Sequence, residues 1–136
     1  MKIEIKNRFN GEIIFSVEEE SWKVAVELAI KEKADLRSAD LSFADLSSAD
    51  LRSANLSSAD LSYANTTKRY IQIGCIGSNK RITTYCFEDD IIWCGCFKGT
   101  LKEFEEKVKE NHKDNKQYLE EYMGFIKYIK ELNKLT

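Results

Sequence analysis

Four cysteines and one histidine are the residues of this chain most able to do chemistry. They are Cys75, Cys86, Cys94, Cys96 and His112. Thiolate and imidazole groups are ligands that zinc prefers, but the chain has no C-x-x-C pair and its cysteine spacings are irregular. In a three-stranded meander Cys75 and Cys96 would lie on the outer strands, roughly 10 Å apart, whereas sulfurs that share one zinc lie within about 4 Å. We therefore interpret the cysteines as buried free thiols, with a Cys-based metal-binding protein as an alternative.

No catalytic motif accompanies these residues. The chain has no G-x-S-x-G, no glycine-rich phosphate loop and no H-E-x-x-H. Lys98 stands between two glycines in "GCFKGT", but the spacing is not that of a Walker loop. His112 falls at the end of a predicted helix, where a histidine complements the helix dipole. We predict no catalytic residue, no cofactor and no metal ligand, so the chain is not expected to be an enzyme.

Bulk composition limits the classes of partner. The chain has 136 residues, 43% of them apolar and 32% charged, with a formal net charge of −2. A charge so near zero does not indicate a nucleic acid or an anionic membrane as the partner. No apolar run approaches the roughly 18 residues that span a bilayer, and the amino terminus "MKIEIKNRF" has no hydrophobic signal core. We expect a cytoplasmic protein whose cysteines are reduced.

The most regular segment of the chain is a run in which leucine returns every fifth residue, and this run is expected to form the scaffold for any site. A five-residue period makes no stripe on an α-helix and alternates faces along a straight strand. A chain that turns a corner once per repeat keeps all of its leucines on one axis, which predicts a β-solenoid. Its expected core comprises Leu36, Leu41, Leu46, Leu51, Leu56 and Leu61, with Ala39, Ala44, Ala49, Ala54 and Ala59 two residues before the leucines.

The motif A-(D/N)-L-x-x resembles the pentapeptide-repeat family, with six full copies from Ala34 to Tyr63 and a degenerate seventh, "ANTTK". The resemblance implies a right-handed, four-sided β-helix with four repeats per coil, so this segment would make about one and a half coils. The stretch "CFEDDIIWCGCFKGTLKEFEEKVKENHKDN" also resembles small pentapeptide-repeat proteins of phages and Gram-positive bacteria.

The resemblance also raises a DNA-mimicking inhibitor or protector of a type II topoisomerase as an alternative function. A rod of one and a half coils would be about 7 Å long, against about 34 Å for one turn of DNA. The outward aspartates are also partly offset by Arg37, Arg52 and Lys68. A disordered Ala/Ser/Asp tract is the alternative to a solenoid, but strict leucine phasing is not typical of low complexity.

Two aromatic groups are candidate interaction residues. Phe43 and Tyr63 lie 20 residues apart in the repeats, so one coil would place them in a single outward column. Either another segment of the chain or a partner could cover that column. The second group is a helical stripe near the carboxy end, for which we expect packing within the chain, with a homo-oligomer contact as the alternative. Its candidate residues are Tyr118, Tyr122, Phe125 and Ile129.

The flanking segments are expected to cover the two ends of the solenoid. Residues 1–33 predict a hairpin with an Asn10-Gly11 turn and a helix capped by Ser21, with Ser16 and Glu19 as a rival start. Residues 69–136 predict three short strands, a helix opened by Thr100 and Glu103, and a last helix capped by Asp114.

The expected fold is mixed α/β: a short right-handed quadrilateral β-helix between an amino-terminal hairpin with a helix and a carboxy-terminal β-meander with two helices. The expected domains are 1–33, 34–68 and 69–136. The expected function is a non-catalytic protein-interaction or assembly module with an unidentified protein partner.

Overall fold

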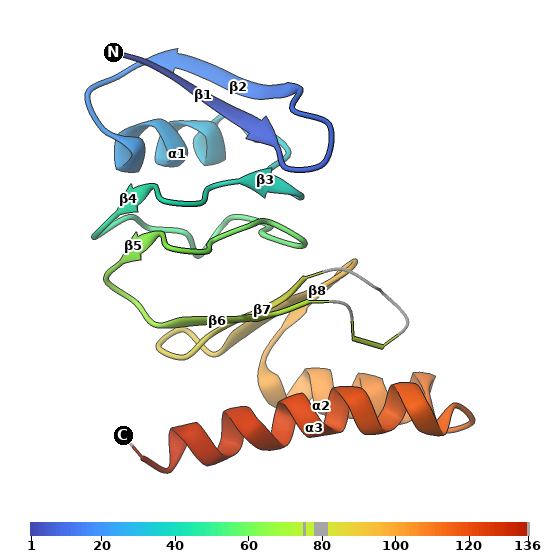
Figure 1. Ribbon diagram of the computed structural model, residues 1–136. Coiled ribbons are helices and arrows are strands. Elements are labelled where there is room, and N and C mark those ends of the chain that lie inside the picture. Colours follow the sequence, from blue (N-terminus) through green and yellow to red (C-terminus); the bar gives the residue numbers. More distant parts are fainter. Residues whose placement is uncertain (75, 78–81, 136) are drawn as a thin grey trace.

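The repeat segment, which we define as residues 34–68, lies in the middle of a stack of layers (Figure 1). A β-hairpin and a helix lie on one side of it, and a sheet backed by two helices lies on the other. The structure is a computed structural model that describes residues 1–74, 76–77 and 82–135. The fold is mixed α/β, as the sequence predicts.

The first two strands form the predicted antiparallel hairpin. Strand β1 (Lys2–Asn7) pairs with β2 (Ile13–Glu18). The connection is longer than an Asn10-Gly11 turn, because the Asn7 side chain accepts hydrogen bonds from the backbone N–H groups of Phe9 and Asn10 at 2.8 and 3.3 Å. Gly11 takes φ +73°, a region in which glycine has no steric penalty.

Helix α1 (Trp22–Lys31) begins at Ser21, whose hydroxyl accepts from the Val24 N–H at 3.2 Å. The rival start at Ser16 is wrong, because Ser16 is still part of β2. The helix buries Ala25, Val26 and Ala29, and the last two belong to the hydrophobic core of the repeats.

The repeat segment contains three strands of two residues each: β3 (Ala39–Asp40), β4 (Asp45–Leu46) and β5 (Asn65–Thr66). Strands β4 and β5 are parallel, and Asp40 forms a parallel bridge with Asp60. Residues 20 apart therefore lie side by side. Strand β3 also pairs with β1, which gives a sheet of order β2-β1-β3. These short pairings do not form a closed or solenoid sheet.

One turn follows each leucine of the repeat segment. From Leu36 to Leu61, each leucine carbonyl accepts from the alanine N–H three residues later, at 2.9 to 3.2 Å. The residue before that alanine has φ between +57° and +65° in every turn except the one at Ser53. A positive φ at this position is the feature of a type II turn. All six leucines are buried, with Ala39, Ala44, Ala54 and Ala59, whereas Ala49 is half-buried.

The carboxy-terminal sheet has four strands in chain order: β6 (Tyr70–Ile73), β7 (Thr83–Cys86), β8 (Ile91–Cys94) and β9 (Phe97–Gly99). The prediction of three strands is wrong, because Gly95 takes φ +59° and opens a two-residue loop between the paired Cys94 and Phe97. The sequence also predicts a break between two strands at Gly77-Ser78-Asn79, of which Ser78 and Asn79 lie outside the described residues.

Two helices follow the sheet. Helix α2 (Leu101–Asn111) begins with the predicted capping box of Thr100 and Glu103. Helix α3 (Lys116–Asn133) is capped by Asn115, one residue later than predicted, because it is the Asn115 side chain that accepts from the Tyr118 N–H at 3.1 Å. None of the helices in the described chain is long and apolar enough to cross a membrane.

The carboxy-terminal sheet separates two hydrophobic cores. Because successive side chains of a strand point to opposite faces, Trp93 faces the core of the repeats while its neighbours Ile92 and Cys94 face the core beneath α2 and α3. The sheet therefore closes one end of the repeat segment and at the same time supports the helix pair.

Candidate interaction surface and pocket

Phe43 and Tyr63 form an exposed aromatic stack on the repeat segment. Their ring centroids lie 4.9 Å apart and their planes differ by 11°. The backbone sets this spacing, because the Phe43 N–H donates to the Ser62 carbonyl at 3.0 Å. The residues are 75% and 82% exposed, so the described chain does not cover the column. The described residues therefore contradict the explanation in which another segment of the chain covers the column.

The two aromatic residues occupy an unfavourable backbone region. Phe43 has φ +62° and Tyr63 has φ +57°, whereas the corresponding corners carry serine at 38, 48 and 58. For residues other than glycine, asparagine and aspartate, the left-handed region costs about 1–2 kcal/mol. Strain of this kind persists where the surrounding structure imposes it, and it is frequent at functional positions.

The second predicted surface, the stripe on α3, is not a surface. Tyr122, Phe125 and Ile129 are buried in the core between the helices and the sheet, and Tyr118 is half-buried against it. These residues therefore pack within the chain, which is the expected one of the two alternatives. The apolar side of α2 and one face of the carboxy-terminal sheet supply the contacts.

The cysteines lie in different surroundings. Cys86 is buried toward the repeats and Cys94 is buried toward the helices. The interpretation of the cysteines as buried thiols is wrong for Cys96, which is exposed at the tip of the β8–β9 hairpin. Burial raises the pKa of the Cys86 and Cys94 thiols. No group of three His, Cys, Asp or Glu side chains in the described residues could hold a metal ion, and Cys75 lies outside those residues.

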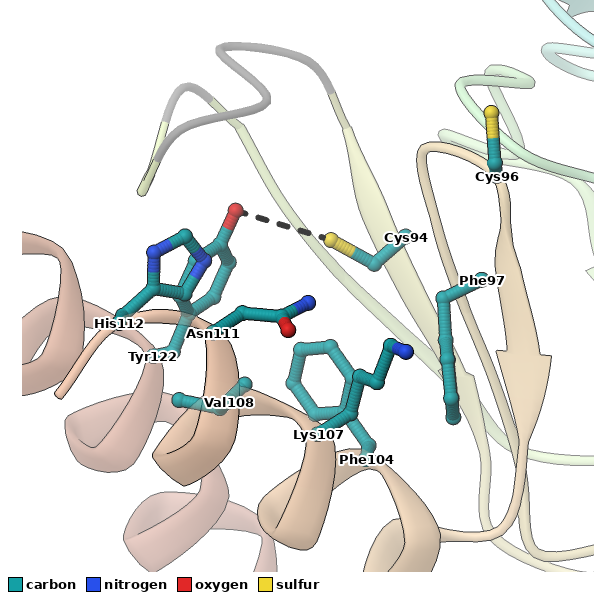
Figure 2. A pocket seen from close by; sticks show the side chains of 9 residues that line it. All are labelled: Cys94, Cys96, Phe97, Phe104, Lys107, Val108, Asn111, His112 and Tyr122. Atoms are coloured by element: carbon teal, nitrogen blue, oxygen red, sulfur yellow. Dashed lines mark hydrogen bonds between the residues drawn. The ribbon is translucent and has the colours of Figure 1, made fainter.

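A pocket of about 320 Å³ opens between α2, α3 and the β8–β9 hairpin (Figure 2). Three aromatic rings line it: Phe104 lies 5.4 Å from Phe97 and 5.6 Å from Tyr122, measured between ring centroids. His112, the predicted helix-end histidine, stacks on Tyr122 at 5.3 Å. The Cys94 sulfur lies 3.9 Å from the Tyr122 hydroxyl.

Polar groups stand beside these rings. Lys107 and Asn111 are exposed, and Figure 2 shows both reaching from α2 toward the sheet. The pocket therefore combines aromatic walls with a cation and an amide. Its lining residues on α2 and at the C-cap of this helix are Phe104, Lys107, Val108, Asn111 and His112.

The outward Asp and Asn residues of the repeats serve the turns. In six successive repeats the Asp or Asn side chain accepts from the backbone N–H two residues later, at 2.9 to 3.2 Å. Asp35 and Asp50 also pair with Arg37 and Arg52. The carboxylates are therefore hydrogen-bonded within the chain, which does not favour their use as a phosphate-like ladder.

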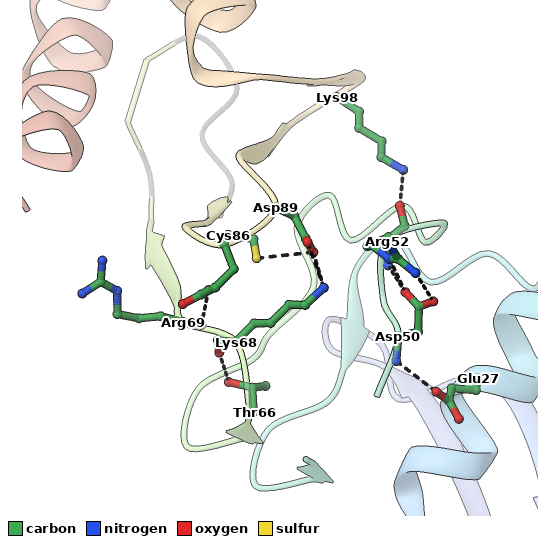
Figure 3. A network of polar contacts seen from close by, with 10 residues as sticks. Glu27, Asp50, Arg52, Thr66, Lys68, Arg69, Cys86, Asp89 and Lys98 are labelled. Atoms are coloured by element: carbon green, nitrogen blue, oxygen red, sulfur yellow. Dashed lines mark hydrogen bonds and ion pairs between the residues drawn. The ribbon is translucent and has the colours of Figure 1, made fainter. Parts of the chain in front are cut away.

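Side chains from both flanks satisfy backbone groups of the repeat segment. Glu27 of α1 accepts from the Asp50 N–H at 2.9 Å, and Lys98 donates to the Arg52 carbonyl at 3.0 Å (Figure 3). The buried indole of Trp93 donates to the Ala54 carbonyl at 3.2 Å. The flanking segments therefore form hydrogen bonds with the backbone of the repeats in addition to packing against it.

An ion pair joins the end of the repeats to the sheet. Lys68 bonds both carboxylate oxygens of Asp89 at 2.8 Å, and the Cys86 thiol donates to the same carboxylate at 3.7 Å (Figure 3). Nearby, Thr66 stands where leucine would continue the repeat, and its hydroxyl donates to the Lys68 carbonyl at 2.7 Å. The position at which the leucine pattern ends therefore lies at a polar junction between the repeats and the sheet.

Sequence reasoning identified the Phe43 and Tyr63 column but missed the pocket and the covering side chains. The pocket had a readable signal, because residues 104, 107, 108, 111 and 112 follow the i, i+3, i+4 spacing of one helix face. The side chains of Glu27, Gln72, Trp93 and Lys98 had none, since each contacts a backbone group far along the chain.

Comparison with known proteins gives one match. Residues 33–65 match the family model of pentapeptide repeats in eight copies. The spacing of the leucines alone indicates six full copies and a degenerate seventh. No curated protein matches the chain, and no solved structure does. The matched segment contains the leucines, the turns and the aromatic stack described above, and it is a run of pentapeptide repeats.

Proposed function

We propose that this chain is a non-catalytic protein-interaction module whose recognition surface is the stack of Phe43 and Tyr63. In this proposal residues 34–68 wind as a short right-handed four-sided β-helix of about one and a half coils. The parallel pairing of Asp45 with Asn65 and of Asp40 with Asp60 supports a coil of 20 residues. The turn after every leucine supports one corner per repeat.

The proposal divides the chain into three units with different roles. Residues 1–33 and 69–136 cover the two ends of the β-helix, and residues 34–68 present the recognition surface. Backbone pairing of β1 with β3 supports the first cover. The hydrogen bonds from Gln72, Trp93 and Lys98 to the repeats support the second.

One observation carries the proposal: two large aromatic rings are held in strained backbone conformations and left in solvent. Serine occupies the same conformation at three other corners, so folding alone does not require an aromatic residue there. Stacked, exposed rings offer rigid apolar area at a low entropic cost, which is why aromatic residues are enriched at protein interfaces.

The partner is another protein that offers an apolar contact to the flat side of the stack. The function as a DNA mimic is not proposed, because the aspartates of the repeats are already bonded within their own turns. A metal-binding function is not proposed either, because the thiols of Cys86 and Cys94 face two different cores.

The test replaces both rings with the residue of the neighbouring corners. A Phe43→Ser/Tyr63→Ser variant keeps residue types that occur at φ +62° to +65° in this same chain, so we expect its melting temperature to stay close to that of the wild type. Tyr128→Ser is the matched control, because it removes an exposed aromatic ring from α3.

The measurements are quantitative co-purification from an extract of the native host and sedimentation velocity of the pure protein. We expect a protein partner that the wild type and Tyr128→Ser capture equally and that the double variant loses. If the pure protein self-associates and only the double variant loses this self-association, the partner is a second copy of the chain rather than another protein. If the double variant keeps every interaction of the wild type, the stack is not a recognition surface.

A further inference from the structure

A second site lies in the carboxy-terminal unit, remote from the aromatic stack of the repeats. We propose that the pocket between α2, α3 and the β8–β9 hairpin binds a small aromatic carboxylate, with the ring of the ligand among Phe97, Phe104 and Tyr122 and its carboxylate on Lys107. This inference is independent of the interaction module proposed above.

The size and walls of the pocket fit one substituted ring. Its volume of about 320 Å³ falls at the lower end of the range of small-molecule sites. Phe104 and Val108 form an apolar wall from α2, and both are buried. Phe104 meets Tyr122 edge to face, with 89° between the ring planes. The ring of a ligand that lies against these walls can make the same edge and offset contacts.

The positive charge of Lys107, beside the aromatic walls of the pocket, favours an anionic ligand. Lys107 forms no ion pair within the part of the chain that the structure describes, whereas Lys109 on the same helix pairs with Glu105 at 2.9 Å. Asn111 lies one turn beyond Lys107, on the same side of α2, and its amide can donate to a carboxylate oxygen. An ammonium and an amide donor together match a carboxylate and disfavour a cationic ligand.

The buried thiol that lines the pocket is not expected to react with the ligand, so binding is reversible. The Cys94 thiol is the only sulfur buried there among the described residues, and it lies 3.4 Å from the Thr83 hydroxyl and 3.9 Å from the Tyr122 hydroxyl. Burial raises the pKa of this thiol, so the nucleophilic thiolate is disfavoured. The ligand therefore stays unmodified.

The test uses benzoate as the probe, with benzamide and benzylammonium as its neutral and cationic counterparts. Each is titrated into the ¹⁵N-labelled full chain, and amide shifts are followed by NMR. We expect saturable shifts with benzoate at residues 97, 104, 108 and 111, and weaker binding of the other two compounds. Tighter binding of benzamide or benzylammonium, or no saturable shift with benzoate, would overturn the proposal.

Two variants separate the role of Lys107 from general charge. Lys107→Met keeps the apolar stem and removes the charge, and we expect it to weaken benzoate binding about tenfold. Lys102→Met removes an exposed lysine of α2 that does not line this pocket, and we expect no change. Equal effects of the two substitutions would contradict a specific contact with Lys107.

Discussion

The side-chain amide of Gln72 pairs with the backbone beside Leu61 as a neighbouring strand would. Its Oε1 accepts from the Leu61 N–H at 3.0 Å, and its Nε2 donates to the Ala59 carbonyl at 2.7 Å. The same Nε2 also donates to the Thr84 hydroxyl at 2.9 Å. One glutamine thus joins the last repeats to the carboxy-terminal sheet, at a point where the two backbones do not pair.

Replacing Gln72 with methionine should destabilise the protein. The substitution keeps a flexible chain of similar length but leaves the Leu61 N–H and the Ala59 carbonyl without this partner. Because an unsatisfied, partly buried backbone group costs about 1–3 kcal/mol, we expect the free energy of unfolding to fall by about 2 kcal/mol. Urea unfolding followed by circular dichroism measures it. Gln117→Met on the exposed side of α3 is the control, and an equal loss in both variants would contradict the role of Gln72.

Ser57→Ala should stabilise the protein. The Ser57 hydroxyl is a buried oxygen that has no hydrogen-bond partner among the described residues, and the residue is 3% exposed. Removing an unsatisfied buried hydroxyl should raise the free energy of unfolding by about 1 kcal/mol. Thermal and urea unfolding measure the change. The comparison variant is Ser47→Ala, which removes a hydroxyl that donates to Asp45 at 2.7 Å and should not stabilise the chain. A less stable Ser57→Ala protein would show that this hydroxyl is bonded.

Acid should weaken the repeat segment through its turn-capping aspartates. The hydrogen bond from the Arg52 side chain, followed by that from the Arg52 backbone N–H, lowers the pKa of Asp50. Hydrogen bonds from Arg37 and Ser47 lower the pKa of Asp35 and of Asp45 in the same way. A carboxylate whose pKa is lower in the folded state contributes stability above its unfolded pKa of about 3.9. That contribution is lost as the pH falls toward the folded pKa.

The Asp50→Asn variant tests this dependence. Asparagine already fills the equivalent position at Asn55, where it accepts from the Ser57 N–H at 3.0 Å. We expect the melting temperature of the variant to change less steeply than that of the wild type between about pH 5 and pH 2. Parallel curves for the two proteins would mean that Asp50 has the same pKa in the folded and unfolded states.

The cysteines should differ in reactivity. In a Cys75→Ser background, iodoacetamide should label Cys96 more than about tenfold faster than Cys86 and Cys94, because labelling of the buried thiols requires local opening. Peptide mass spectrometry after timed labelling measures the rates. Labelling in denaturant is the control and should remove the difference. Equal rates in the native protein would contradict the burial of Cys86 and Cys94.

Local sequence was sufficient wherever a structure depends on residues close along the chain. The five-residue period predicted a turn after every leucine, and the turns from Leu36 to Ala64 are present. The capping groups of Ser21 and Thr100 predicted where two helices begin. Such features depend on backbone geometry and on hydrogen bonds within a few residues, both of which are encoded in adjacent side chains.

Contacts between distant segments were decided by the tertiary structure. The aromatic spacing on α3 is the same whether Tyr122 and Phe125 meet a second chain or their own sheet, and only the position of that sheet shows that they are buried. The spacing of Phe43 and Tyr63 likewise predicts one column but not its exposure. The period of a repeat predicts which residues stack, because residues one coil apart lie side by side. It does not record what lies over the stack, because burial depends on how separate elements pack, and that packing is a property of the whole chain.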